Sequence, residues 1–168
     1  MLLDNDLKTA FASESCACMK YLSFAKKAEY EGLKKIAKLF RAAAEAELIH
    51  AHNHLRAMKL IKTSTDNIKA VLNEKVYTSE KMYKPMIENA KVEGDSWSIK
   101  SFCYAYEAGK VIVRLFEKAI RNIGEEKEVD YFICKVCGFA VENEIPERCP
   151  ICGSQKKVFK KIDYADQV

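Results

Sequence analysis

Apolar side chains recur at alternating intervals of four and three residues through most of the first 123 residues. This spacing places them on one face of an α-helix. The pattern runs in four stretches, which are interrupted at Gly32, at the polar segment 63–66 and at 94–96. Helices with matched apolar stripes bury them against one another, so residues 1–123 are predicted to form a mainly α four-helix bundle. With only six Gly and three Pro in 168 residues, a turn-rich β fold is excluded.

The second pair of helical stretches repeats the first. Tyr21 and Tyr83 occupy equivalent positions in the two halves, and Glu31-Gly32 is matched by Glu93-Gly94. A repeat of this kind predicts that each half is a helical hairpin and that the bundle has pseudo-two-fold symmetry.

Composition changes near residue 124, where a short charged linker over 124–130 is predicted to precede a small domain over 131–168. This last segment contains two Cys-x-x-Cys pairs, formed by Cys134 and Cys137 and by Cys149 and Cys152. Two such pairs bring four thiolates to one tetrahedral metal ion. Zinc and iron suit four sulfur ligands equally well, so the pattern predicts a metal site without choosing between a structural zinc and a redox-active iron.

Two carboxylates and a histidine lie within the apolar stripes of the first two helices: Glu14, Glu47 and His50. An unpartnered carboxylate in a helical core costs several kcal/mol, so these groups need partners. Glu47-x-x-His50 presents both side chains on one face, as in the core metal sites of helical bundles. The alternative is a hydrogen-bonded polar cluster without metal. In the repeat, the equivalents of Glu14, Glu47 and His50 are Val76, Gly109 and Ile112, so the second half lacks this motif.

Charge and cysteine content limit the function classes. The formal net charge is +4 with Lys and Glu interleaved, which does not favour nucleic-acid binding. No apolar run reaches the roughly 20 residues of a membrane span, and no export signal is visible. The odd number of seven Cys argues against a disulfide scaffold. We therefore expect a cytoplasmic protein without a nucleic-acid or membrane partner, in which Cys16, Cys18 and Cys103 are free thiols.

These motifs together resemble the rubrerythrin family over essentially the whole chain. The matching segments are 11–15 around Glu14, Tyr21, Glu31-Gly32, Glu47-x-x-His50, Asn67-x-Lys69-Ala70, Met82-Tyr83 and the cysteine module. The resemblance implies a ferritin-like bundle with a di-iron centre, followed by a rubredoxin-like Fe(Cys)₄ domain. It also implies reduction of hydrogen peroxide in defence against oxidative stress, with electrons passed from the rubredoxin-like iron and supplied by a redox partner such as a reductase.

This chain departs from the family pattern at the bundle ligands. Where the family has two glutamates in the third helix, Lys75 and Thr78 stand here, and the second Glu-x-x-His of the family is replaced by Gly109 and Ile112. One hypothesis is a redox protein in which Glu14, Glu47 and His50 hold at most one further iron or zinc. The other is a non-enzymatic electron carrier or structural metal-binding protein, in which Lys75 takes the place of the bundle metals.

Connection lengths predict the assembly. A second helix over 33–61 is roughly 40 Å long, whereas the polar break 62–66 spans at most about 17 Å. In a ferritin-like bundle the second and third helices run parallel, so this break is too short to return along the bundle within one subunit. We therefore expect a homodimer in which the first two helices of one chain pair with the last two of the other.

Overall fold

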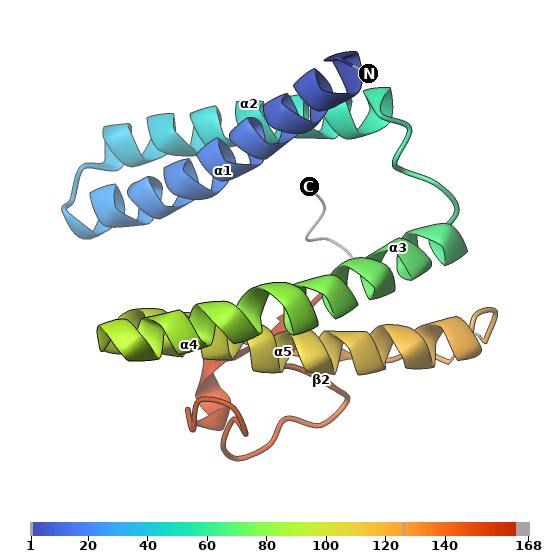
Figure 1. The fold of residues 1–168 in the computed structure, drawn as a ribbon. Helices are drawn as coiled ribbons and strands as arrows, with labels where there is room; N and C mark the ends of the chain where they lie inside the picture. The colour runs from blue at the N-terminus through green and yellow to red at the C-terminus, as the bar shows by residue number, and fades with distance from the viewer. Residues whose placement is uncertain (1, 126, 164–168) are drawn as a thin grey trace. The chain divides into compact units, whose positions relative to one another are not determined.

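The computed structural model describes residues 2–125 and 127–163 (Figure 1). It divides into two compact units, of which the first ends at Lys62 and the second begins at Thr63. Glu126 of the expected linker and residues 164–168 of the expected C-terminal domain lie outside the described residues. Within the described ranges, no helix has the length and apolar character needed to cross a membrane.

The first unit is a hairpin of two long helices, α1 (Leu2–Tyr30) and α2 (Lys34–Ala57). Gly32 lies in the turn between them with a φ of 77°, a left-handed conformation that glycine adopts without strain. The buried residues of the hairpin are small and let the two helices approach closely: Cys18, Ala25, Ala28, Ala37, Ala44 and Ala51. The larger members of the predicted stripes lie at the margins of this seam, as shown by the Phe40 ring 6.3 Å from the Tyr21 ring.

The second unit contains the remaining helices. α3 (Ser64–Tyr77), the π-helical turn η1 (Thr78–Tyr83) and α4 (Lys84–Glu93) follow one another as one long rod, and all three contact α5 (Ser96–Arg121) (Figure 1). The sequence predicts one helix over this rod, and the structure adds the widened turn in its middle. That turn ends two residues before Pro85, which has no N–H to donate back along the helix and whose ring crowds the preceding turn.

The chain between the hairpin and α3 differs from the sequence-based expectation. The connection covers residues 58–63, several residues earlier than the predicted break at 62–66. Thr63 caps α3, because its hydroxyl oxygen accepts a hydrogen bond from the backbone N–H of Asp66 at 3.2 Å. The polar residues 64–66, which were expected to separate two helices, therefore form the first turn of the second one.

A small antiparallel sheet follows α5. It contains β1 (Tyr131–Cys134), β2 (Ala140–Glu142) and β3 (Phe159–Ile162) in the order β2-β1-β3, with a short 3₁₀ turn, η2 (Lys156–Val158), just before β3. The chain from 143 to 158 connects β2 to β3 and carries the second cysteine pair.

The sheet packs against α5 within the second unit. A cavity of about 310 Å³ lies between them, lined almost entirely by apolar side chains: Ile112, Leu115, Phe116, Ala119, Tyr131, Ile133 and Ala140. An ion pair between Lys118 of α5 and Glu142 of β2 fixes the same contact. The C-terminal segment is therefore seated on α5.

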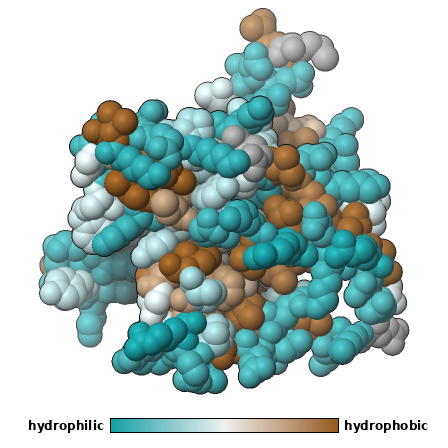
Figure 2. All heavy atoms as spheres, turned by 60° about the horizontal axis from the view of Figure 1, so that its bottom comes forward, coloured by the Kyte–Doolittle hydropathy of each residue, from teal (hydrophilic) through white to brown (hydrophobic). Residues whose placement is uncertain are grey.

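Many large apolar side chains of the helices remain exposed to solvent, and Figure 2 shows hydrophobic residues reaching the surface between charged ones. Those on the helices include Met19, Phe24, Leu39, Ile49, Val76 and Tyr77. These side chains are available for contact with another helix or another chain.

Candidate metal centres

The four cysteines of the C-terminal segment lie on two turns of the same design. In the first, the Gly138 N–H donates to the Cys134 carbonyl at 2.9 Å. In the second, the Gly153 N–H donates to the Cys149 carbonyl, also at 2.9 Å. Gly138 and Gly153 have φ values of 76° and 73°, so each turn uses the left-handed freedom of glycine. The two turns thus present their cysteines to a common point.

The sulfur atoms are arranged as a tetrahedral metal ion requires. All four Sγ atoms lie within 4.8 Å of one another. Cys134 Sγ lies 3.6 Å from Cys152 Sγ, and Cys137 Sγ lies 3.4 Å from Cys149 Sγ. A tetrahedral ion with metal–sulfur bonds of about 2.3 Å separates its ligands by about 3.8 Å. The residues present therefore fit a tetrathiolate site.

The thiols differ in their environments. Burial raises the pKa of Cys137 and of Cys149, so these thiols hold their protons until a cation displaces them. Burial would raise the pKa of Cys152, but hydrogen bonds with the side chain and backbone of Ser154, together with those of Cys149 and Cys134, lower it to about 6. Cys152 is also the one member of the four that is not fully buried. The cluster therefore meets solvent at Cys152.

A shell of apolar side chains surrounds the sulfur cluster. Phe139 and Phe159 pack against it, and their rings meet edge to face with centroids 6.3 Å apart. Tyr131 lines the cavity against α5. Tyr104 of α5 packs against the cysteines, and sequence reasoning missed it. Tyr104 and Ala108 are four residues apart and therefore lie on one face of α5. Their spacing in the sequence is the signal that could have indicated a second contact face on this helix.

The first unit brings the other predicted ligands together. One oxygen each from Glu14 and Glu47 and one ring nitrogen of His50 lie within 4.8 Å of one another. His50 Nδ1 lies 3.4 Å from Glu47 Oε2. The Glu47 side chain is 20% exposed, but that of His50 is 56% exposed, so His50 is less buried than a position in an apolar stripe predicts. An exposed ligand leaves room for solvent or a small molecule beside the carboxylates.

The two carboxyl groups shift each other's pKa in opposite directions. A hydrogen bond with Glu47 raises the pKa of Glu14, and the same hydrogen bond lowers the pKa of Glu47. Of the two, Glu14 therefore holds a proton more readily. Two carboxylates at this distance repel each other when both are ionised, which either a proton or a cation relieves. Two carboxylates and an imidazole are a donor set that suits divalent iron or zinc.

The corresponding part of the second unit has no such cluster. Among the described side chains, only the four cysteines and the set Glu14, Glu47 and His50 form a group with metal-ligand spacing. Beside Gly109 lies the buried Ser79, whose Oγ is 3.9 Å from the position that a Cβ on Gly109 would take. Thr78 bonds through its hydroxyl to the carbonyl of Lys75. None of the four residues at the family's ligand positions carries a carboxylate or an imidazole: Lys75, Thr78, Gly109 and Ile112.

The fold and these two clusters define a class of protein in which a helical ligand cluster is combined with a small tetrathiolate metal domain. Comparison with known proteins identifies the family within that class. The rubrerythrin family model matches residues 5–134, and the model of the rubrerythrin rubredoxin-like domain matches residues 132–160. The chain belongs to the rubrerythrin family. It is a rubrerythrin-like non-haem iron redox protein, with ferritin-like helices followed by a rubredoxin-like domain, as the sequence predicts.

Individual relatives match over nearly the whole chain. Rubrerythrin-2 of Clostridium acetobutylicum is 33% identical over 171 residues, covering 92% of this chain and 93% of the relative. Nigerythrin of Nitratidesulfovibrio vulgaris is 30% identical over 168 residues, covering 92% of this chain and 83% of the relative. The solved structure of fully reduced, all-ferrous nigerythrin aligns with a TM-score of 0.59 at 29% identity, covering 95% of this chain and 86% of that one.

Proposed function

We propose that Cys134, Cys137, Cys149 and Cys152 hold one iron ion that carries a single electron. The observation that carries this proposal is the tetrahedral spacing of the four sulfur atoms in a chain of the rubrerythrin family. Iron in this ligand set cycles between its ferric and ferrous states, whereas zinc has no redox chemistry. The protein's part is to exclude water with the surrounding aromatic side chains and to keep the four ligands in place.

Metal analysis tests this assignment. Anomalous scattering measured at the iron and zinc edges is expected to show iron at the cysteine cluster, and visible absorption from thiolate-to-iron charge transfer is expected to bleach reversibly with dithionite. A cluster filled with zinc in protein produced with sufficient iron would contradict the electron-transfer function.

We further propose that Glu14, Glu47 and His50 bind one metal ion, iron or zinc. Their donor atoms lie within 4.8 Å of one another, and a cation between the two carboxylates would relieve their mutual repulsion. Glu47→Gln should abolish this second site and leave the cysteine site intact. His52→Ala is the matched control, because His52 is also on α2 but points to solvent. Equal metal content in wild type and Glu47→Gln would show that the cluster is only a hydrogen-bonded one.

Hydrogen peroxide is the proposed electron acceptor if the second site holds iron. Reduction of peroxide to two water molecules takes two electrons and two protons, so the cysteine site must be reduced twice by a redox partner such as a reductase. The raised pKa of Glu14 suits its carboxyl group to supplying a proton to a reacting oxygen at this site. An NADH-linked peroxide assay with a reductase is expected to show slow turnover, which Glu47→Gln should abolish. Absence of turnover in the iron-loaded protein would leave only the electron-carrier function.

We propose a homodimer in which α1 and α2 of one chain pack with α3, α4 and α5 of another. Its support is the exposed apolar surface of the helices and the short connection. Residues 58–63 and their flanking bonds span at most about 23 Å, whereas α2 is about 36 Å long. Light scattering should show a dimer at micromolar concentration. A monomer would refute the arrangement.

We also propose domain boundaries at residues 123 and 131 and a cytoplasmic location. Cys16, Cys18 and Cys103 carry free thiols, which a reducing compartment preserves. Fractionation of the source cells with a thiol-trapping reagent is expected to find the protein reduced in the cytoplasm. Disulfide-bonded protein outside the cytoplasm would contradict this.

A further inference from the structure

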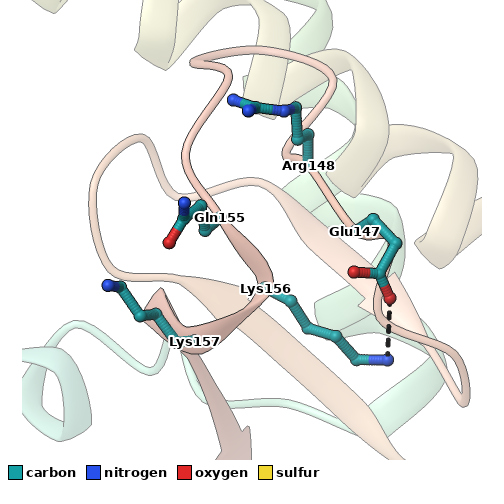
Figure 3. A pocket seen from close by; sticks show the side chains of 5 residues that line it. All are labelled: Glu147, Arg148, Gln155, Lys156 and Lys157. Carbon is teal, nitrogen blue, oxygen red and sulfur yellow. Dashed lines mark ion pairs between the residues drawn. The ribbon is translucent and has the colours of Figure 1, made fainter.

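A basic hollow lies beside the second cysteine turn. It has a volume of about 370 Å³ and is lined by Glu147, Arg148, Gln155, Lys156 and Lys157. Figure 3 shows Arg148 and Lys157 on either side of Gln155, with Lys156 extended toward Glu147. These residues belong to the chain segments that enter and leave the turn of Cys149 and Cys152.

The hollow is built onto the metal-binding turn by several contacts. The guanidinium of Arg148 donates to the carbonyl of Gly153 at 3.3 Å. Arg148 and Gln155 form an antiparallel bridge, and the Lys156 N–H donates to the Glu147 carbonyl at 3.0 Å. These bonds tie the backbone of the hollow and the Arg148 side chain to the turn that bears Cys149 and Cys152.

The charge of the hollow is positive after its internal pairing. Lys156 pairs with Glu147 at 3.5 Å. Among the described residues, Arg148 and Lys157 have no acidic partner, and neither has Lys135, which is exposed in the first cysteine turn. Glu142, the acidic residue of β2, is occupied by Lys118 of α5. Arg148 and Lys157 thus leave unneutralised positive charge at the hollow beside the second cysteine turn.

This charge lies where electrons must enter or leave the metal site. Cys152 is the cysteine of the cluster that is only partly buried, and it is four residues from Arg148 and five from Lys157. Electron tunnelling slows steeply with distance, so a redox partner has to dock close to the least covered ligand. Complementary charge speeds such an encounter and fixes its orientation.

We propose that the hollow, through its unneutralised cations Arg148 and Lys157, is the docking surface for a one-electron donor protein of negative net charge. This rests on the proposed electron-transfer function of the cysteine site. In the encounter the reduced donor loses one electron and the cysteine site gains it, and no bond or proton is exchanged. A nicotinamide nucleotide does not fit this role, because it delivers a hydride and the cysteine site takes one electron at a time.

Stopped-flow reduction of the iron-loaded full chain by an acidic rubredoxin tests the proposal. Lys157→Glu should lower the second-order rate constant about tenfold at low salt, and about 0.5 M salt should remove most of the difference. Lys20→Glu is the matched control, because Lys20 is an exposed lysine of α1 and its substitution changes the net charge equally. Its rate constant should equal that of wild type.

Reduction by dithionite distinguishes failure of the electron-transfer function from failure of the docking surface. If dithionite does not bleach the cysteine site, the electron-transfer function is wrong and the docking surface falls with it. If dithionite bleaches wild type and variant alike, but the donor reduces Lys157→Glu as fast as wild type at low salt, the docking surface alone is refuted. Binding of the wild type to immobilised RNA at physiological salt is a further measurement. If Lys157→Glu loses this binding while its electron-transfer rate is unchanged, the hollow is a nucleic-acid surface and the docking proposal is refuted.

Discussion

Two glycines of the second unit should respond to alanine in opposite directions. Gly109 lies in the middle of α5 with an ordinary helical backbone, and a Cβ there would come no closer than 3.9 Å to another side chain, at Ser79 Oγ. That separation is ordinary van der Waals contact. Gly109→Ala therefore removes the helix penalty of glycine without creating a clash, and should raise the free energy of unfolding by about 1 kcal/mol. For a chain of this size the melting temperature should rise by about 2–4 °C.

Gly138 is the matched comparison. A Cβ on Gly138 would lie 4.0 Å from the Cβ of Ala108, so space is again available. Its φ of 76° is left-handed, however, and alanine there costs about 1–2 kcal/mol. Thermal unfolding of the metal-loaded variants, followed by circular dichroism at 222 nm, measures both effects. A lowered melting temperature for Gly109→Ala would refute the reasoning, since some group must then lie closer to Gly109 than Ser79 does.

Three further outcomes are expected. Cys152→Ser should lose the visible absorption of an iron tetrathiolate and retain less metal, as measured by absorption and elemental analysis. Tyr104→Ala should destabilise the contact between α5 and the cysteine domain by about 1–2 kcal/mol and speed iron loss to a chelator, whereas the exposed control Trp97→Ala should do neither. Asp95 caps α5, and hydrogen bonds from Ser98 and Trp97 lower its pKa below the unfolded value. Its stabilising effect is therefore complete above about pH 4 and is lost as the pH falls through the lowered pKa. The stability gap between wild type and Asp95→Asn should shrink in acid, and a gap that widens there would contradict the cap.

The features that depend on residues close together in the sequence could be predicted from it. The two cysteine turns follow from the position of a glycine directly after the second cysteine of each pair, and the structure confirms their geometry. The closeness of Glu47 and His50 follows from one helical turn, and Glu14 joins them because the α1–α2 hairpin is formed by neighbouring stretches of chain.

Features that depend on packing between distant segments were not predictable in the same way. The apolar pattern of α5 does not tell which residues face α3 and α4 and which face the cysteine domain. The contact of Tyr104 with the cysteines was missed for this reason. The π-helical turn depends on how the chain accommodates Pro85 within a long rod. The early end of α2 at Ala57 is a third case, because the apolar pattern continues past it to Ile61.

Helix α5 belongs to two layers at once, since α3 and α4 contact it and the cysteine domain is seated on it. Because α5 contacts both layers, it cannot unfold without disrupting both of them. Its amide protons between Tyr104 and Ala119 should exchange with solvent only through openings that disrupt the cysteine domain as well. Metal binding at the cysteine cluster should then slow amide hydrogen exchange along α5, although α5 supplies none of the metal ligands.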